Sequence, residues 1–192
     1  TNCYVISNNS ECIIIDPGAE PDKIIDFLES MKLTPKLLIS THYHADHVGG
    51  VKNLVEKYDV EFAIGKNDLN FLDAQPAWVS NLISTYEKPI SPNILLLGGE
   101  TINLLDLDIK IISTPGHSPG SICIYVENSI FTGDTLFKNG IGRGDLPGGD
   151  INQEITSIKD KIFQLPNDID VFPGHGDKTK IINEKNDNIH LK

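Results

Sequence analysis

The stretch Thr41–His47 (THYHADH) limits most strongly what this chain can fold into, because it places three histidines and one aspartate within six positions. A packed apolar core does not accept so many ionisable groups, since each would lose its water and need new hydrogen bonds. A bound cation removes that difficulty, because imidazole nitrogen and carboxylate oxygen are donors that Zn²⁺ accepts at about 2.0–2.2 Å. In an extended stretch, His42 and His44 point to one side, while Asp46 and His47 can turn to another. The stretch can therefore serve two neighbouring metal ions.

The composition is that of a globular protein with a sizeable core. The chain has 192 residues, of which 39% are hydrophobic and 22% charged, and this length favours a single domain over residues 1–192. The sequence starts at Thr1 rather than Met, so this prediction leaves room for a short N-terminal piece. No apolar run approaches the about 18 residues of a membrane span, and we see no signal peptide at the start. We therefore expect no membrane partner.

Net charge and cysteine content indicate which partners and which cellular location to expect. A formal net charge of −11 argues against nucleic acid, because no basic stripe is present to neutralise phosphates. Cys3, Cys12 and Cys123 have no metal-ligand spacing, and each lies in an apolar segment. We expect buried, reduced thiols, which fits a cytoplasmic location. The sequence leaves the oligomeric state open.

Strand and helix signals predict an α+β architecture. Short β-rich runs lie at 3–7, 11–15, 36–41, 61–64, 94–97, 101–105, 109–114, 121–126, 129–132 and 169–172. Helical spacing of apolar residues predicts helices over 20–32, over 46–58 and from Asp150 onward. Segment 178–186 is expected to be a short polar helix. The order of these elements suggests two sheets packed together, with helices outside.

The helix from Asp150 and segment 66–92 differ in how clearly the sequence predicts them. The helix from Asp150 has Gln153 as a capping-box partner, and its apolar face is expected to consist of Ile151, Ile155, Ile158 and Ile162. Segment 66–92 is less regular. It is either one or two short helices with a loop over the site, or an ordinary surface excursion anchored by Trp78.

Four apolar strands end in short polar turns that carry potential ligands. The ligands are His42 with the cluster after it, His117, Asp134 and His175. Taken alone, each later residue would be an ordinary turn or capping residue. Because five histidines and two aspartates fall together at strand ends, where loops on a rigid scaffold build sites, we predict that they bind metal. Tyr43 should point away from the ligands, because side chains alternate along a strand.

Four motifs resemble the metal motifs of the metallo-β-lactamase superfamily. They are HYHADH at 42–47, TPGHSPGS at 114–121, FTGDTLF at 131–137 and PGHG at 173–176. They occur in order across nearly the whole chain. The sequence around His117 and Asp134 is most similar to that of glyoxalase II, the hydroxyacylglutathione hydrolases. The resemblance implies a four-layer αββα sandwich.

The resemblance also implies a ligand set. His42, His44 and His117 would hold a first ion; Asp46, His47 and His175 would hold a second; and Asp134 would bridge them. Two Zn²⁺ per chain are expected, with Fe or Mn as other metals. Two such ions about 3.5–4 Å apart can share a water, lower its pKa and present hydroxide to a carbonyl. Asp46 and Asp134 would then be catalytic because they fix the ions, with the metal-bound water as nucleophile. No G-x-S-x-G elbow supports a rival hydrolase mechanism.

The substrate implied by the resemblance is a small-molecule thioester such as S-lactoylglutathione. Glyoxalase II carries a helical C-terminal domain that supplies much of its glutathione site, whereas only a short segment follows His175 here. The chain is therefore more similar to short bacterial glyoxalase II-like hydrolases, whose segment before the last helix resembles 141–150. There, Arg143 either clamps a substrate carboxylate or pairs with Asp145 to shape the loop.

Other functions stay open. Persulfide dioxygenases share equivalents of several ligands, among them His42 and Asp134, but bind a single iron through two histidines and one carboxylate. They also carry an Arg-x-Asp turn like the one at Arg143. β-Lactam hydrolysis is argued against by the lack of an export signal and by Asp46, which matches the thioesterase pattern. A metal-binding module without catalysis is the last alternative.

Overall fold

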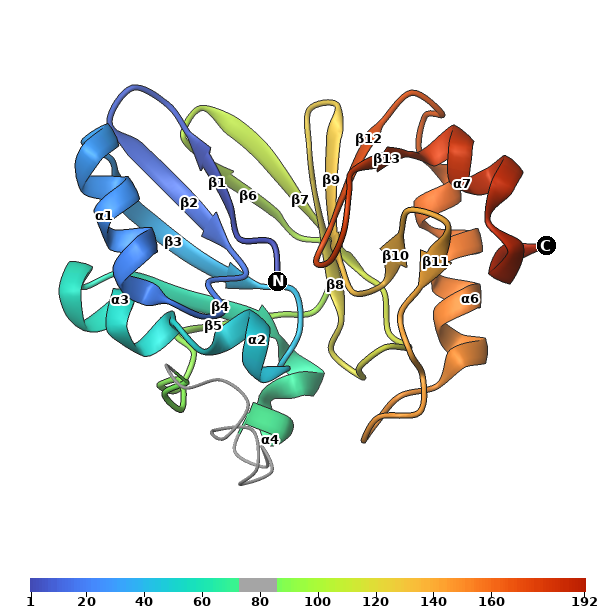
Figure 1. Ribbon diagram of the computed structural model, residues 1–192, viewed down its shortest axis with the longest axis horizontal. Coiled ribbons are helices and arrows are strands. Elements are labelled where there is room, and N and C mark those ends of the chain that lie inside the picture. Colours follow the sequence, from blue (N-terminus) through green and yellow to red (C-terminus); the bar gives the residue numbers. More distant parts are fainter. Residues whose placement is uncertain (73–85) are drawn as a thin grey trace. The chain divides into compact units, whose positions relative to one another are not determined.

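The computed structural model describes residues 1–72 and 86–192, which form two compact units, Thr1–Leu96 and Leu97–Lys192 (Figure 1). Each unit contains one large β-sheet. The single-domain organisation stays a prediction. No helix in the described ranges is long and apolar enough to cross a membrane.

The sheet of the first unit has the strand order β1-β2-β3-β4-β5. Its strands are β1 (Tyr4–Ser7), β2 (Glu11–Ile15), β3 (Thr34–Ser40), β4 (Glu61–Gly65) and β5 (Ile94–Leu96). β1 and β2 form an antiparallel hairpin, and β2 to β5 run parallel. The Asn8 side chain stabilises the turn of this hairpin, because it accepts the backbone N–H groups of Ser10 and Glu11 at 3.1 and 2.9 Å.

Helices cover one face of this sheet (Figure 1). They are α1 (Pro21–Met31) and α3 (Val51–Tyr58), and the unit also contains α2 (Ala45–Val48), η1 (Lys66–Asp68) and α4 (Leu69–Leu72). Leu28 of α1 and Leu54 of α3 belong to one buried cluster with Leu38 and Phe62 of the sheet. This apolar contact fixes the strand ends at which the site is built. Residues 73–85, with Trp78, lie outside the described residues, so the prediction for that part of 66–92 stays a prediction.

The prediction of one continuous helix over 46–58 is wrong, because α2 ends before Gly49 and α3 begins after Gly50. The backbone here is pressed against the loop after β2. Gly50 N–H donates to the Pro17 carbonyl at 2.8 Å, and a Cβ on Gly49 would lie 2.5 Å from the Gly18 carbonyl oxygen. The two glycines therefore permit a close backbone approach that no side chain would allow.

The sheet of the second unit has the strand order β13-β12-β9-β8-β7-β6. Its strands are β6 (Thr101–Leu104), β7 (Leu107–Ser113), β8 (Ile122–Val126), β9 (Ser129–Gly133), β12 (Asp170–Pro173) and β13 (Thr179–Lys180). β9 and β12 are parallel, so their C-terminal ends lie at the same edge of the sheet. A separate small hairpin joins β10 (Leu136–Phe137) and β11 (Gly140–Ile141), which the sequence did not indicate.

One face of the second sheet is covered by α6 (Ile151–Asp160) and α7 (Ile181–Asp187), with the short turns η2 (Ile162–Gln164) and η3 (Ile189–Leu191). Ile158 and Ile181 pack with Val171 in its core. Two expectations are corrected here. Segment 178–186 starts as strand β13 before it becomes helical. On α6, Ile151 is 40% exposed whereas Glu154 is buried, so the apolar face differs from the one expected.

The start of α6 at Asp150 is confirmed, and it gives a test of the local energetics. The Asp150 side chain accepts the N–H groups of Asn152 and Gln153 at 2.9 and 3.1 Å. We expect Asp150→Ala to lower the free energy of unfolding by about 1 kcal/mol, because two helix N–H groups lose their acceptor. Asp160→Ala at the opposite end of α6 is the control and should change it little. Urea denaturation measures both, and equal effects of the two variants would contradict the capping role.

Candidate metal centre

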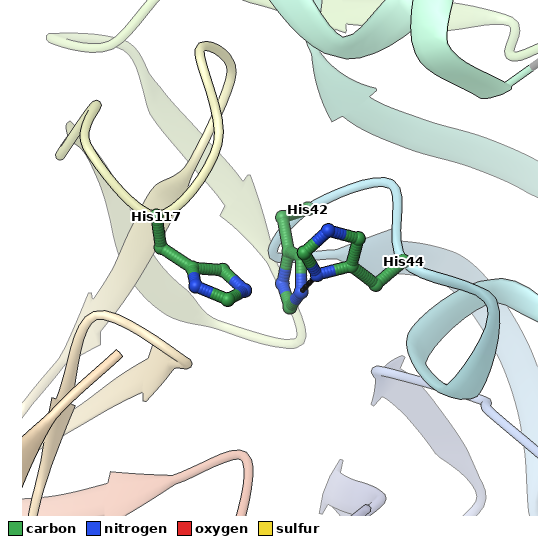
Figure 2. Close-up of side chains that lie close together, drawn as sticks. All are labelled: His42, His44 and His117. Carbon is green, nitrogen blue, oxygen red and sulfur yellow. Dashed lines mark hydrogen bonds between the residues drawn. The ribbon is translucent and has the colours of Figure 1, made fainter. Parts of the chain in front are cut away.

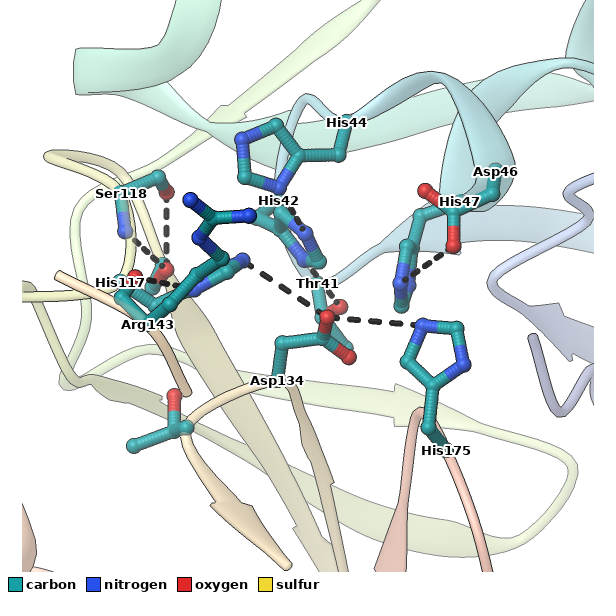
Figure 3. Close-up of polar contacts among 12 residues, drawn as sticks. Thr41, His42, His44, Asp46, His47, His117, Ser118, Asp134, Arg143 and His175 are labelled. Atoms are coloured by element: carbon teal, nitrogen blue, oxygen red, sulfur yellow. Dashed lines mark hydrogen bonds and ion pairs between the residues drawn. The ribbon is translucent and has the colours of Figure 1, made fainter. Parts of the chain in front are cut away.

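The first unit carries its candidate ligands between β3 and α3. His42 and His44 lie on the loop after β3, and their rings meet edge to face, with the His42 Nε2 and His44 Nδ1 atoms 2.9 Å apart (Figure 2). His44 has an extended backbone and is the N-cap residue of α2. Asp46 and His47 are presented by this short helix, with 3.6 Å between Asp46 Oδ2 and His47 Nε2 (Figure 3).

The second unit carries its candidate ligands on three turns that follow β7, β9 and β12. The Asp134 carboxylate lies between two histidine rings (Figure 3). Its Oδ2 atom is 3.7 Å from His117 Nε2 and 3.5 Å from His175 Nε2. One carboxylate oxygen therefore faces imidazole nitrogens from two separate loops.

These spacings fit a metal better than they fit hydrogen bonds. The three carboxylate–imidazole distances of 3.5 to 3.7 Å exceed the 2.7–3.2 Å that N–H···O hydrogen bonds span. Two ligand atoms about 2.1 Å from one tetrahedral ion lie about 3.4 Å apart. The donors are nitrogen and oxygen only, as Zn²⁺, Fe and Mn accept. These three carboxylate–imidazole pairs therefore fit a divalent metal in both chemistry and spacing, whereas the His42 and His44 nitrogens, 2.9 Å apart, lie at hydrogen-bond distance.

Asp16 is a functional residue that the sequence analysis missed. It is buried at the end of β2, accepts the N–H of Thr41 at 2.7 Å and the Thr41 hydroxyl at 2.8 Å, and lies 2.9 Å from His47 Nδ1. A carboxylate on Nδ1 fixes the tautomer, so that Nε2 becomes the coordinating atom. The sequence carries the same signal at Asp16 as at the candidate ligands, because Asp16 also follows an apolar strand.

Arg143 contributes its main chain as well as its side chain. Its carbonyl oxygen lies 3.0 Å from His117 Nδ1, which again leaves Nε2 for coordination. The guanidinium is exposed and pairs with Asp145 through two contacts of 2.7 and 2.8 Å; these hydrogen bonds lower the pKa of Asp145 to about 2. The pair shapes the loop, and a contact of Arg143 with substrate stays a prediction.

Tyr43 lies in the hydrophobic cluster of the first unit, but its ring also meets that of the candidate ligand His44 edge to face, with 4.5 Å between the ring centroids, so the prediction that it points away from the ligands is not confirmed. Its ring centroid is 5.1 Å from that of Phe71, and burial raises the pKa of Tyr43 to about 12. Its backbone N–H donates to the buried carboxylate of Asp68 at 2.9 Å. Tyr43 therefore anchors the ligand loop.

Residues 1–175 match the family model of the metallo-β-lactamase superfamily. The probable metallo-hydrolase YqgX of Bacillus subtilis is 35% identical, covering 99% of this chain and 92% of the relative. The hydroxyacylglutathione hydrolase GloC of Haemophilus influenzae is 34% identical, with the same two coverages of 99% and 92%.

Two solved structures extend the comparison. The BLEG-1 B3 metallo-β-lactamase has a TM-score of 0.92 at 33% identity, with 99% of this chain and 93% of that chain covered. TTHA1623 in a di-iron-bound form has a TM-score of 0.89 at 34% identity, with 99% and 94% covered. The chain belongs to the metallo-β-lactamase superfamily. The predicted α+β fold of the metallo-β-lactamase type is confirmed.

The role of Asp16 can be tested without metal. In Asp16→Asn, an amide NH₂ group replaces one carboxylate oxygen. Depending on the orientation of the amide, this donor then faces another donor, either the Nδ1–H of His47 or one of the two donors of Thr41. We expect the free energy of unfolding to fall by about 1–3 kcal/mol, because a buried donor loses its acceptor. Urea denaturation in EDTA measures this change.

Ser40→Ala is the control for this variant. It removes one buried hydrogen bond, from the Ser40 hydroxyl to the His47 carbonyl at 3.1 Å, without creating two opposed donors. A loss in Asp16→Asn no larger than that in Ser40→Ala would contradict the role assigned to Asp16.

Proposed function

We propose that this chain is a binuclear metallo-hydrolase that cleaves acyl-thiol esters of the S-lactoylglutathione type. The proposed ligands are His42, His44, Asp46, His47, His117, Asp134 and His175. The observation that carries the proposal is the position of Asp134 Oδ2, at 3.7 and 3.5 Å from the Nε2 atoms of His117 and His175. A single oxygen between two imidazoles at ligand–ligand spacing is what a bridge between two ions requires.

The proposed chemistry divides between metal and protein. Bound divalent cations would supply a water of lowered pKa and positive charge for the developing oxyanion. The protein orients its donors: Asp16 holds His47 through Nδ1, and the Arg143 carbonyl holds His117 through Nδ1. Each ring is thereby kept in one tautomer and one orientation. This assignment requires no nucleophilic side chain.

The thioester substrate is supported by the GloC relative, which resembles this chain over nearly its full length. The segment that follows β11 supplies a second argument. Arg143 is exposed beside the candidate ligand His117, where a planar guanidinium could bind the carboxylate of a small thioester in place of Asp145. We assign Arg143 this role in substrate binding.

Two comparisons support alternative activities. The similarity to BLEG-1, named as a β-lactamase, makes β-lactam hydrolysis the second candidate function. The di-iron form of TTHA1623 makes iron a candidate metal, and a single iron would favour persulfide dioxygenation instead. Metal content and substrate must therefore be measured together.

The test loads the full chain with Zn²⁺, Mn²⁺ or Fe²⁺, counts bound metal by mass spectrometry, and screens thioesters of glutathione, coenzyme A and simple thiols. We expect about two ions per chain and thioester turnover that chelation abolishes. Nitrocefin and glutathione persulfide with O₂ are the competing substrates. One iron per chain with O₂ uptake, or turnover of nitrocefin alone, would overturn the proposal. Anomalous diffraction at the zinc and iron edges would identify the ions.

The bridging role of Asp134 predicts a loss of metal as well as rate. Asp134→Ala should lower both the bound metal per chain and kcat, because two ions that share a carboxylate lose it together. Tyr43→Phe is the control, and its activity should stay within roughly tenfold of wild type, since phenylalanine keeps the ring that packs in the apolar cluster and against His44. Unchanged metal stoichiometry in Asp134→Ala would count against a bridge.

A further inference from the structure

Glu154 occupies a position where a carboxylate is unfavourable. It lies on α6 with 0% of its surface exposed. Neither carboxylate oxygen has a partner that meets both the distance and the angle of a hydrogen bond among residues 1–72 and 86–192. Burial raises the pKa of Glu154 to about 8. An unpaired buried carboxyl costs free energy, so fold stability alone would favour an apolar residue at this position.

The neighbours of Glu154 connect it to a candidate ligand. A Cβ on Gly116, the residue before His117, would lie 2.2 Å from Glu154 Cα. A Cβ on Gly142 would lie 2.7 Å from Glu154 Oε1 and 2.8 Å from His117 Nδ1. The carboxyl and the imidazole therefore approach the same side of Gly142, and two glycines make that approach sterically possible.

The same backbone segment holds the histidine ring. Glu154 Oε1 lies beside Gly142, and the Gly142 N–H lowers the pKa of Glu154 against the larger, opposite effect of burial. The carbonyl of the next residue, Arg143, lies 3.0 Å from His117 Nδ1. A group that fixes Gly142 thereby fixes the acceptor for the Nδ1 proton of His117.

We propose that Glu154 is a positioning residue: its carboxyl holds the Gly142–Arg143 backbone so that the Arg143 carbonyl accepts the Nδ1 proton of His117. The Nε2 atom of His117 is then left as the coordinating atom. The inference rests on the proposed function in one respect, that His117 is a ligand. Burying the carboxyl lowers the stability of the fold, and in return the His117 ring has a defined tautomer and orientation.

The variants separate positioning from packing. Glu154→Leu retains apolar volume and removes the buried carboxyl, so the metal-free protein should be at least as stable as wild type. Glu154→Gln keeps an oxygen that can accept the Gly142 N–H, and it should behave as wild type. Glu154→Met serves as a second apolar variant if Glu154→Leu folds poorly.

Glu184→Gln is the matched control. Glu184 is an equally buried glutamate on α7, but it accepts the Thr179 hydroxyl at 2.7 Å and the Asn139 N–H at 2.8 Å. Its replacement should lower stability and leave His117 unchanged. It therefore reports what the loss of a buried carboxylate does when that carboxylate has only structural partners.

The deciding measurement is NMR of metal-free protein with ¹⁵N-labelled histidine, at a pH where His117 is neutral. We expect the Nδ1–H tautomer in wild type, Glu154→Gln and Glu184→Gln, and a mixture with the Nε2–H tautomer in Glu154→Leu and Glu154→Met. Titration with Co²⁺ should then show about tenfold weaker binding in the apolar variants.

A wild-type tautomer in both apolar variants would overturn the proposal, as would a tautomer change in Glu184→Gln of the same size. The readout needs neither metal nor turnover. A wild-type protein without thioesterase activity would therefore refute the proposed function while the assignment of Glu154 stands on its own result.

Discussion

The contact that organises the first unit is the Asp16 carboxylate, because it joins three elements at one point. It follows β2, accepts the N–H and hydroxyl of Thr41 at the end of β3, and approaches the His47 ring on α2. A loop with four ionisable groups would otherwise have many arrangements of similar energy. The carboxylate selects one of them, because each departure leaves a buried donor unsatisfied. The glycines at 49 and 50 complete the arrangement by letting α2 lie against the Pro17–Gly18 backbone.

Buried carboxylates in this chain differ in what they stabilise. Asp16 and Glu184 are fully engaged by donors and contribute to the stability of the fold. Glu154 is placed where burial dominates its electrostatics, with Asp134 raising its pKa further. The loss of folding free energy caused by the buried Glu154 carboxyl therefore occurs next to the candidate metal ligands. Functional sites are where proteins most often retain such unfavourable burial.

The candidate ligands could be located in the sequence for a physical reason. His42, His117, Asp134 and His175 each follow an apolar strand, and strand ends are visible as a change from apolar to polar residues. Apart from Asp16, which also follows an apolar strand, the features that the sequence did not predict lack such a signal. Two-residue strands such as β10 and β13 have no period to detect. The break at Gly49 depends on a contact with Gly18, which is distant in sequence. The burial of Glu154 depends on glycines from two other loops, so its own helix could not reveal it.

The contact between His117 and Arg143 is made by the main chain, and this has a consequence for divergence within the superfamily. A carbonyl oxygen is common to all amino acids, so the acceptor at position 143 survives every substitution there. The exposed side chain of the same residue is free to change with the molecule that the enzyme must recognise. The main chain at this position can therefore keep the histidine ring oriented while the side chain changes with the substrate. Relatives with different substrates can retain the same orientation of this ring.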